Sequence, residues 1–313
     1  MSGIRVAGLT KTYRGGAVRA LDSVSLDVRA GEAFGIIGPN GAGKTTLMGC
    51  LLGMLRPDSG RIEIDGRAPD ALAVRRVVGY LPERLVLDRW MTGTRFLAYH
   101  HALAELDPAR RSEDVRTSFE RVGLEPAAAS MTIRKYSRGM LQRLGLAQAL
   151  LGSPRYLFLD EPISGVDPAG VILFRRLLSE VRARGATLIV NSHQLAEVER
   201  ICDRVAFVKA GHIESIETSR AADTLAHVLL VRWTASTGPE ITSAERLAAV
   251  AQSVEAVLHD TQTHGARFGV RDDDGTARLL DALRAAGVRI TEARPEGSRL
   301  ERLFAERPER EEA

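Results

Sequence analysis

The residues best suited to chemistry stand in one glycine-rich stretch, GPNGAGKTT, which follows the apolar run Ala33–Ile37. Its spacing, Gly38-x4-Gly43-Lys44-Thr45, is the P-loop pattern of nucleoside triphosphate sites. Glycines let the backbone approach a ligand closely, and successive N–H groups at a helix N-terminus attract a polyphosphate. The ammonium group of Lys44 suits the β- and γ-phosphates, and the Thr45 hydroxyl suits Mg²⁺. We therefore expect the phosphates to bind at Gly38, Pro39, Asn40, Gly41, Ala42, Gly43, Lys44, Thr45 and Thr46.

A second group of polar residues follows two further apolar runs. Tyr156–Leu159 is followed by Asp160 and Glu161, and Thr187–Asn191 is followed by a serine and His193. Taken alone, this pattern also fits buried strands that merely end at polar positions. Beside a P-loop, it favours Asp160 as a Mg²⁺ ligand acting through water. It likewise favours Glu161 as the base that orients and deprotonates the attacking water.

Between these two groups lies the segment KYSRGMLQR, residues 135–143. Ser137 is a good helix N-cap, and an apolar helical pattern follows it, so a purely structural role is as reasonable as a functional one. The order of the motifs is more specific than any one of them. Over roughly residues 3–217 the chain resembles the nucleotide-binding domain of ATP-binding cassette (ABC) transporters. The resemblance lies in the order of five motifs: the P-loop, YSRGM, LFLDEP, SGVDP and NSH.

The resemblance implies a role for each matching residue. Tyr13 would stack on the adenine of ATP, and His193 would hydrogen-bond the γ-phosphate and tether Glu161. Ser137 and Gly139 would contact the γ-phosphate bound to a second copy of the chain, so that a homodimer encloses two Mg-ATP. On their own, an aromatic near the first turn and a histidine at a strand end are more often structural. The implied catalytic residues are Lys44, Glu83, Glu161 and His193, the implied metal ligands are Thr45, Glu83 and Asp160, and Asp167 is implied at the dimer seam.

Two positions depart from the usual pattern of the family. Glu83 stands where glutamine is common, in the lid between the two lobes. Its carboxylate would reach Mg²⁺ or the attacking water, and it adds negative charge beside the γ-phosphate. The signature reads Ser137-Arg138-Gly139-Met140 where Ser-Gly-Gly-Gln is commonest, which retains the hydroxyl and the glycine N–H. Both departures resemble prokaryotic exporter-type ATPases encoded apart from their membrane subunits.

Apolar runs and turns predict the elements that must hold these residues. Helical periods over about residues 86–152 predict a helical insertion within a domain where strands alternate with helices. Such alternation favours an α/β fold with a mostly parallel sheet. The resemblance implies that this is a P-loop NTPase core with an N-terminal antiparallel β subdomain and a helical signature subdomain. Strands are predicted at Ile4–Leu9, Ala20–Val28, Ala33–Ile37, Arg61–Ile64, Val77–Leu81, Tyr156–Asp160, Thr187–Asn191 and Val205–Lys209. Helices are predicted at Thr94–Leu106, Ala109–Val122, Gly139–Leu151, Ala169–Arg184 and Gln194–Cys202.

The pattern changes near residue 220, so we expect two domains, 1–219 and 220–313. The second has the order βαββαβ of a small α+β, ferredoxin-like unit, and it resembles the C-terminal domain of many exporter ATPases. The run DDDG at residues 272–275 lacks the further acids that Ca²⁺ requires and predicts a turn. Its elements are expected at Val228–Trp233, Ser243–Gln252, Val254–His259, Ala266–Arg271, Thr276–Ala286 and Val288–Ala293, with a last helix at Ser298–Glu306 and a charged tail at Arg307–Ala313.

The composition is that of an ordinary globular protein of 313 residues, with 27% charged and 44% hydrophobic residues. No apolar run approaches the ~18 residues needed to span a bilayer, and nothing near Met1 resembles a signal peptide. The only cysteines, Cys50 and Cys202, lack metal-ligand spacing and fit a reducing compartment. The net charge is only +3 and no dense basic run appears, so we expect no direct contact with nucleic acid.

These features predict the ATPase subunit of an ABC exporter. It would act at the cytoplasmic face of the cell membrane, as a homodimer that drives a polytopic permease on a separate chain. Leu85, Val86, Leu87 and Trp90, within Glu83–Arg95, are expected to dock on that permease, although packing into this chain's own core is an equal alternative. The alternative function is a soluble ABC ATPase acting on nucleic acid or the ribosome. A regulatory module with weak hydrolysis is disfavoured by the complete catalytic set.

Overall fold

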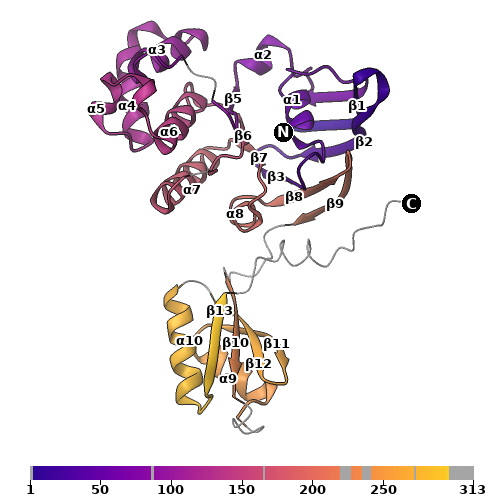
Figure 1. Ribbon diagram of the computed structural model, residues 1–313, viewed down its shortest axis with the longest axis vertical. Coiled ribbons are helices and arrows are strands. Elements are labelled where there is room, and N and C mark those ends of the chain that lie inside the picture. The colour runs from indigo at the N-terminus through magenta and orange to yellow at the C-terminus, as the bar shows by residue number, and fades with distance from the viewer. Residues whose placement is uncertain are drawn as a thin grey trace. The chain divides into compact units, whose positions relative to one another are not determined.

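The computed structural model describes residues 3–85, 88–164, 166–218, 227–234, 241–270 and 273–295. The chain divides into two compact units, Met1–Ser219 and Arg220–Ala313 (Figure 1). Across the ranges that the structure describes, no helix combines the length and the apolar character needed to cross a membrane.

The first unit begins with a three-stranded antiparallel sheet in the order β2-β1-β4. Its strands are β1 (Ile4–Tyr13), β2 (Val18–Val28) and β4 (Ser59–Ile64). Residues on one face of these strands, among them Val6 and Leu26, are buried, because alternate side chains point to the same side of a strand. This antiparallel sheet is the β subdomain that the resemblance implied.

A six-stranded sheet in the order β5-β6-β7-β3-β8-β9 forms the centre of the first unit. Neighbouring strands from β5 to β8 are parallel, and β9 is antiparallel to β8. Every residue of β3, β6 and β7 is buried, as in parallel sheets covered on both faces. The predicted α/β class is therefore confirmed. The strands are β3 (Ala33–Ile37), β5 (Val78–Leu81), β6 (Tyr156–Asp160), β7 (Thr187–Asn191), β8 (Arg204–Lys209) and β9 (His212–Thr218).

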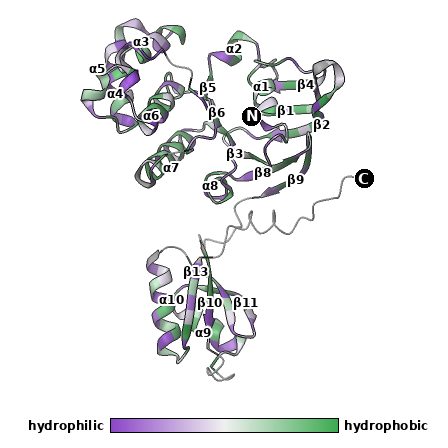
Figure 2. Ribbon diagram, viewed as in Figure 1, coloured by the Kyte–Doolittle hydropathy of each residue, from purple (hydrophilic) through white to green (hydrophobic). Residues whose placement is uncertain are grey.

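Helix α1 (Lys44–Leu51) packs between the two sheets, since Leu47 and Met48 belong to the same apolar cluster as Val6 of β1 and Phe34 of β3. The other helices of the α/β core are α2 (Leu72–Arg75), α7 (Pro168–Ala183) and α8 (Leu195–Ile201). Hydrophobic and hydrophilic residues alternate along α7 in Figure 2, as expected for a helix with one buried face.

A group of short helices follows β5, as the helical periods predicted. It comprises α3 (Gly93–Leu103), α4 (Arg111–Arg121), α5 (Pro126–Ser130) and α6 (Arg138–Ala149). Two of them begin at side-chain caps: the Thr92 hydroxyl accepts the N–H of Arg95, and the Ser137 hydroxyl accepts the N–H of Met140. The predicted helix over Ala109–Val122 starts as a 3-10 turn, Pro108–Arg110.

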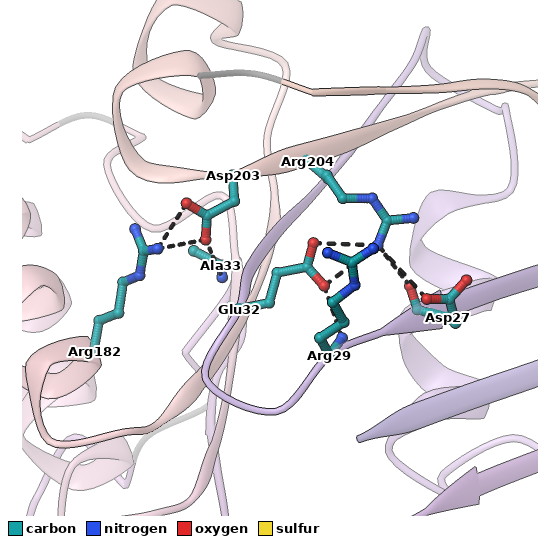
Figure 3. Close-up of polar contacts among 7 residues, drawn as sticks. All are labelled: Asp27, Arg29, Glu32, Ala33, Arg182, Asp203 and Arg204. Atoms are coloured by element: carbon teal, nitrogen blue, oxygen red, sulfur yellow. Dashed lines mark hydrogen bonds and ion pairs between the residues drawn. The ribbon is translucent and has the colours of Figure 1, made fainter. Parts of the chain in front are cut away.

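Ion pairs fasten the beginning of β3 to its neighbours (Figure 3). The Glu32 carboxylate, only 7% exposed, lies 3.2 Å from the guanidinium of Arg204. Asp203 accepts hydrogen bonds from Arg182 of α7 at 2.6 Å and from the N–H of Ala33 at 3.0 Å. Because the P-loop follows the other end of β3, these contacts set the position of the strand that carries it.

The second unit is a four-stranded antiparallel sheet in the order β11-β12-β10-β13 with two helices. Together with the chain order βαββαβ, this strand order is the predicted ferredoxin-like arrangement. Its elements are β10 (His227–Trp233), α9 (Ala244–Ser253), β11 (Val257–Gln262), β12 (Gly265–Val270), α10 (Asp273–Ala285) and β13 (Ile290–Pro295).

Two expectations about local structure need correction, and one strand was not anticipated. Asp273, Asp274 and Gly275 form the first turn of α10 rather than a loop turn, and the carboxylate of Asp274 is favourable near the positive end of the helix dipole. Strand β11 begins at Val257, not at Val254, which is the C-cap of α9. Strand β9 was not expected at all. The helix predicted at Ser298–Glu306 lies outside the described residues.

Candidate active site

The carboxyl ends of three neighbouring parallel strands bring the predicted site residues together. Ile36 of β3 and Asp160 of β6 both lie in register with Asn191 of β7. The segments that follow these strands, namely the P-loop, the acidic pair and Ser192-His193, therefore emerge at one edge of the sheet. In open α/β sheets, ligands bind at this edge.

Two glycines are required by the path of the P-loop. A Cβ at Gly38 would stand 2.0 Å from the carbonyl oxygen of Val208. Gly43 has φ +103°, and a Cβ there would lie 2.2 Å from the carbonyl oxygen of Ala20. Gly43 is also the N-cap of α1, so the loop leads directly into a helix N-terminus. This geometry presents backbone N–H groups to an anion.

Lys44 is 8% exposed, and its ammonium group donates to the carbonyl oxygens of Gly38 at 2.7 Å and Pro39 at 2.9 Å. Burial lowers the pKa of this amine, whereas the carboxylates of Glu161 and Asp160 raise it. The cation is therefore held over the loop by carbonyl groups and lies within electrostatic reach of both acids.

Asp160, at the end of β6, is 4% exposed and accepts a 2.6 Å hydrogen bond from the side-chain amide of Asn191. Burial is the main cause that raises the pKa of Asp160, and the charges of Glu83 and Glu161 raise it further. The Asn191 hydrogen bond and Lys44 act in the opposite direction. A divalent cation would relieve this crowding of carboxylates. The donor set of Asp160 and the exposed Thr45 hydroxyl at the start of α1 fits Mg²⁺.

Glu161 is held by several contacts and adopts an unusual backbone conformation. Its φ is +49°, a left-handed value that is strained for a residue with a Cβ and is found at functional sites. His193 contacts the carboxylate twice, through Nδ1 at 2.8 Å and through its backbone N–H at 3.1 Å. The Ser192 hydroxyl donates at 3.3 Å. The carboxylate is thus oriented while the His193 side chain stays 61% exposed.

Glu83 follows β5, the neighbour of β6, and lies at the same edge. The negative charge of Glu83 raises the pKa of Asp160 and the pKa of Tyr80. Burial is the larger cause for Tyr80, whose pKa rises to about 12. Glu83 is exposed, so its carboxylate is accessible to a ligand at this edge.

The other predicted residues make mostly local contacts, and Asp167 also lies 3.9 Å from the guanidinium of Arg143 in α6. The Ser137 hydroxyl caps α6, where it accepts the N–H of Met140 at 3.2 Å, and the residue is exposed. At Gly139 a Cβ would meet nothing within 4 Å, so the start of α6 is open. The ring of the half-buried Tyr13 has its centroid 5.8 Å from the ammonium nitrogen of Lys11. Asp167 caps α7 by accepting the N–H of Gly170 at 2.6 Å.

Two polar residues with a place in the site were not singled out from the sequence. Asn191 binds Asp160, and its buried Oδ1 has no hydrogen-bond partner among the described residues. Gln142 of α6 donates to the carbonyl oxygen of Pro162 at 2.9 Å, next to Glu161, and so connects the helical group to the acidic pair. A polar side chain that ends an otherwise apolar run was the available signal for Asn191.

Comparisons with known proteins agree with this geometry. Residues 21–164 match the family model described as ABC transporter. An ABC transporter ATP-binding protein from Nostoc is 41% identical over 216 residues, covering 67% of this chain and 64% of that protein. A fluoroquinolones export ATP-binding protein from Mycobacterium tuberculosis is 35% identical, covering 69% of this chain and 70% of the relative. The chain spans less than two thirds of the length of the Nostoc relative.

A solved structure has the same fold. It is an ATP-binding cassette in a dimeric, post-hydrolysis state with ADP and phosphate, and it superposes with a TM-score of 0.65. The match covers 70% of this chain and 99% of that structure at 24% sequence identity. The chain therefore belongs to the family of ABC transporter ATP-binding proteins.

Proposed function

We propose that this chain binds and hydrolyses ATP as one subunit of an ABC exporter. Two copies would enclose two Mg-ATP and drive a polytopic permease on a separate chain, at the cytoplasmic face of the cell membrane. One observation carries the proposal: Lys44, Asp160, Glu161 and His193 meet at the carboxyl edge of one sheet.

Binding would begin at the P-loop. The N–H groups of residues 38–46 and the N-terminus of α1 would hold the phosphates, and Lys44 would place its charge between the β- and γ-phosphates. Thr45 and Asp160 would hold Mg²⁺, with Glu83 near, and the bound ion would neutralise phosphate charge. Tyr13 would pack against the adenine ring.

Hydrolysis requires a base beside the γ-phosphate. The Glu161 carboxylate would accept a proton from the attacking water, whose oxygen forms a bond to the γ-phosphorus while the bond to ADP breaks. His193 fixes the carboxylate through two contacts and would bind the γ-phosphate with its exposed ring. Products are ADP and inorganic phosphate.

The second copy would complete each site. The open N-terminus of α6, with the exposed Ser137 and with Gly139, suits an anion on another molecule. We place these groups on the γ-phosphate bound to the partner chain, as the family resemblance implies, with Asp167 at the seam. The dimeric form of the solved cassette supports this arrangement.

Export through a membrane partner is supported by the export function for which the Mycobacterium relative is named and by the small second unit. The apolar stretch after β5 offers a docking point. Leu85 packs against Gly145 of α6, whereas Trp90 is 75% exposed with the guanidinium of Arg134 5.4 Å from its ring. Val86 and Leu87 lie outside the described residues. We assign Trp90 to contact with the permease.

Substitution of Glu161 tests the chemistry. Glu161→Gln keeps the shape but removes the base, so turnover is expected to fall by about 10²-fold or more. ATP binding should persist, and the ATP-bound dimer should accumulate in size-exclusion chromatography. Glu125→Gln, at an exposed position outside the site, is the matched control. Near-normal turnover of the Glu161 variant would remove it from the role of base.

Purification from detergent-solubilised native membranes tests the transport role. A polytopic membrane protein recovered in stoichiometric amount is expected, and Trp90→Glu should weaken its recovery while ATP binding is unchanged. Leu72→Glu, also at an exposed apolar residue, is the control. Recovery of ribosomal or DNA-bound proteins without a membrane protein would favour the soluble ABC ATPase instead. Full recovery with Trp90→Glu would exclude that residue from docking.

A further inference from the structure

A pocket of about 230 Å³ lies at the opposite ends of the strands that carry the active site. Three helices end at it: Arg121 is the last residue of α4, Leu150 is the C-cap of α6, and Arg184 is the C-cap of α7. Ser153 and Arg155, which precede β6, complete the polar part of the lining. Three arginines thus share one small cavity.

Arg121 has guanidinium nitrogen atoms without hydrogen-bond partners among the described residues. Its Nε and Nη2 atoms are buried and have no hydrogen-bond partner in the part of the chain that the structure describes. Burial is the main cause that lowers the pKa of Arg121, and the charge of Arg184 lowers it further, against a raising effect of Glu180. Arg155 differs, because its guanidinium is paired with Asp65 at 2.9 Å. Buried donors without partners cost free energy, so the position of Arg121 beside the pocket needs a reason.

Helix dipoles explain only part of the clustering of arginines at this pocket. Cations are favourable at helix C-termini, where they bind the last free carbonyl groups, and both Arg121 and Arg184 stand at such ends. However, two buried N–H groups of Arg121 donate to no carbonyl among the described residues. The dipoles therefore account for the positive charge at this place and leave the directed donors unexplained.

We propose that this pocket binds inorganic phosphate between Arg121 and Arg184, with the Ser153 hydroxyl as a further donor. The planar guanidinium presents paired N–H donors that match an oxyanion. The volume is below the roughly 300–1,000 Å³ of pockets for drug-sized ligands, which favours a small ion. The site is distinct from the P-loop, because it lies where β6 and β7 begin and the P-loop lies at the edge where they end.

Isothermal titration calorimetry measures the affinity of this site for inorganic phosphate, with chloride used to keep the ionic strength constant. Saturable binding is expected for the full chain and for Lys44→Ala, whose P-loop is impaired. Arg121→Gln and Arg184→Gln should weaken the binding at least about tenfold, because each removes charge-assisted donors. Arg116→Gln, exposed on the same helix α4, is the control for the loss of one positive charge and should bind like the unmodified chain.

A second measurement covers the case in which Arg121→Gln folds poorly. Phosphate should raise the unfolding temperature of the unmodified chain and of Arg116→Gln above the value in chloride, and this increase should be clearly smaller in Arg184→Gln, where the substituted residue is exposed. The proposal is overturned if the arginine variants respond to phosphate as the unmodified chain does, or if Lys44→Ala alone abolishes the binding.

Discussion

The two compact units bury different kinds of side chain. Among the described residues, the buried charged groups lie in the first unit, where Glu32, Lys44, Asp160 and Glu161 are at most 9% exposed. The core of the second unit is a cluster of apolar side chains such as Trp233, Leu247, Phe268 and Leu283. Apolar burial is sufficient to hold a small sheet with two helices. Buried charges add nothing to such a core unless they have a further role.

The first unit shows two kinds of buried charge, and the difference between them marks the site. Glu32 lies beside the guanidinium of Arg204, so it is matched by an opposite charge. Asp160 instead lies near two other carboxylates, and Lys44 hydrogen-bonds carbonyl oxygens. Crowded like charges at a strand edge are costly, and such clusters are typical of functional sites. The second unit has no such feature among its described residues.

The largest effect is expected in the apolar core of the second unit. Phe268 is fully buried in β12, and Phe268→Ala should destabilise that unit by about 3–5 kcal/mol through lost burial and a cavity. Trp233 lies in the same cluster, so its emission reports unfolding of this unit when the exposed Trp90 is replaced by Phe.

The same variant separates the two units functionally. Nucleotide affinity of Phe268→Ala should equal that of the unmodified chain at temperatures where Trp233 remains buried. Weaker nucleotide binding under these conditions would show that the second unit supports the candidate site. The two units would then not be functionally independent.

A smaller effect on free energy is expected at Lys44. Lys44→Ala removes the charge aimed at the phosphates, and one charge-assisted interaction contributes roughly 1.5–3 kcal/mol, so ATP affinity should fall by about 10²-fold. Calorimetric titration with ATP measures this loss, and Arg75→Ala, at an exposed position on α2, is the control for charge. An affinity within about threefold of the unmodified chain would contradict the P-loop assignment.

The sequence predicts residues that the structure brings to one sheet edge, because the signals for this candidate site are local. Gly38, Gly43 and Lys44 lie within one loop, and a run of buried residues that ends in Asp160 and Glu161 defines both a strand and its edge. Parallel strands then bring these segments together without further information. The βαββαβ order of the second unit was predictable for the same reason.

Features that depend on distant partners were not predictable. Strand β9 (His212–Thr218) has no fully buried residue, and its partly buried Ile213 and Ile216 reach the core because β9 pairs with β8. Arg121 and Arg184 lie in separate helices, and nothing in either local pattern indicates that they share a pocket. From the sequence, Asn191 is only the polar end of a strand. The structure shows that its side-chain amide donates a hydrogen bond to Asp160.

The smallest effect is expected at Glu83 and concerns pH rather than turnover. The negative charge of Glu83 raises the pKa of Asp160, so Glu83→Gln lowers that pKa. In the proposed function Asp160 would hold Mg²⁺ in its ionised form, so the acid-side loss of Mg²⁺-dependent ATP binding should move to lower pH in the variant. Titrations between about pH 4 and pH 8 measure the profile, with Glu125→Gln as control. An unchanged pH profile, or a shift to higher pH, would show that the charge of Glu83 does not act on Asp160. Glu83 would then not belong to the group of crowded carboxylates that distinguishes the first unit from the second.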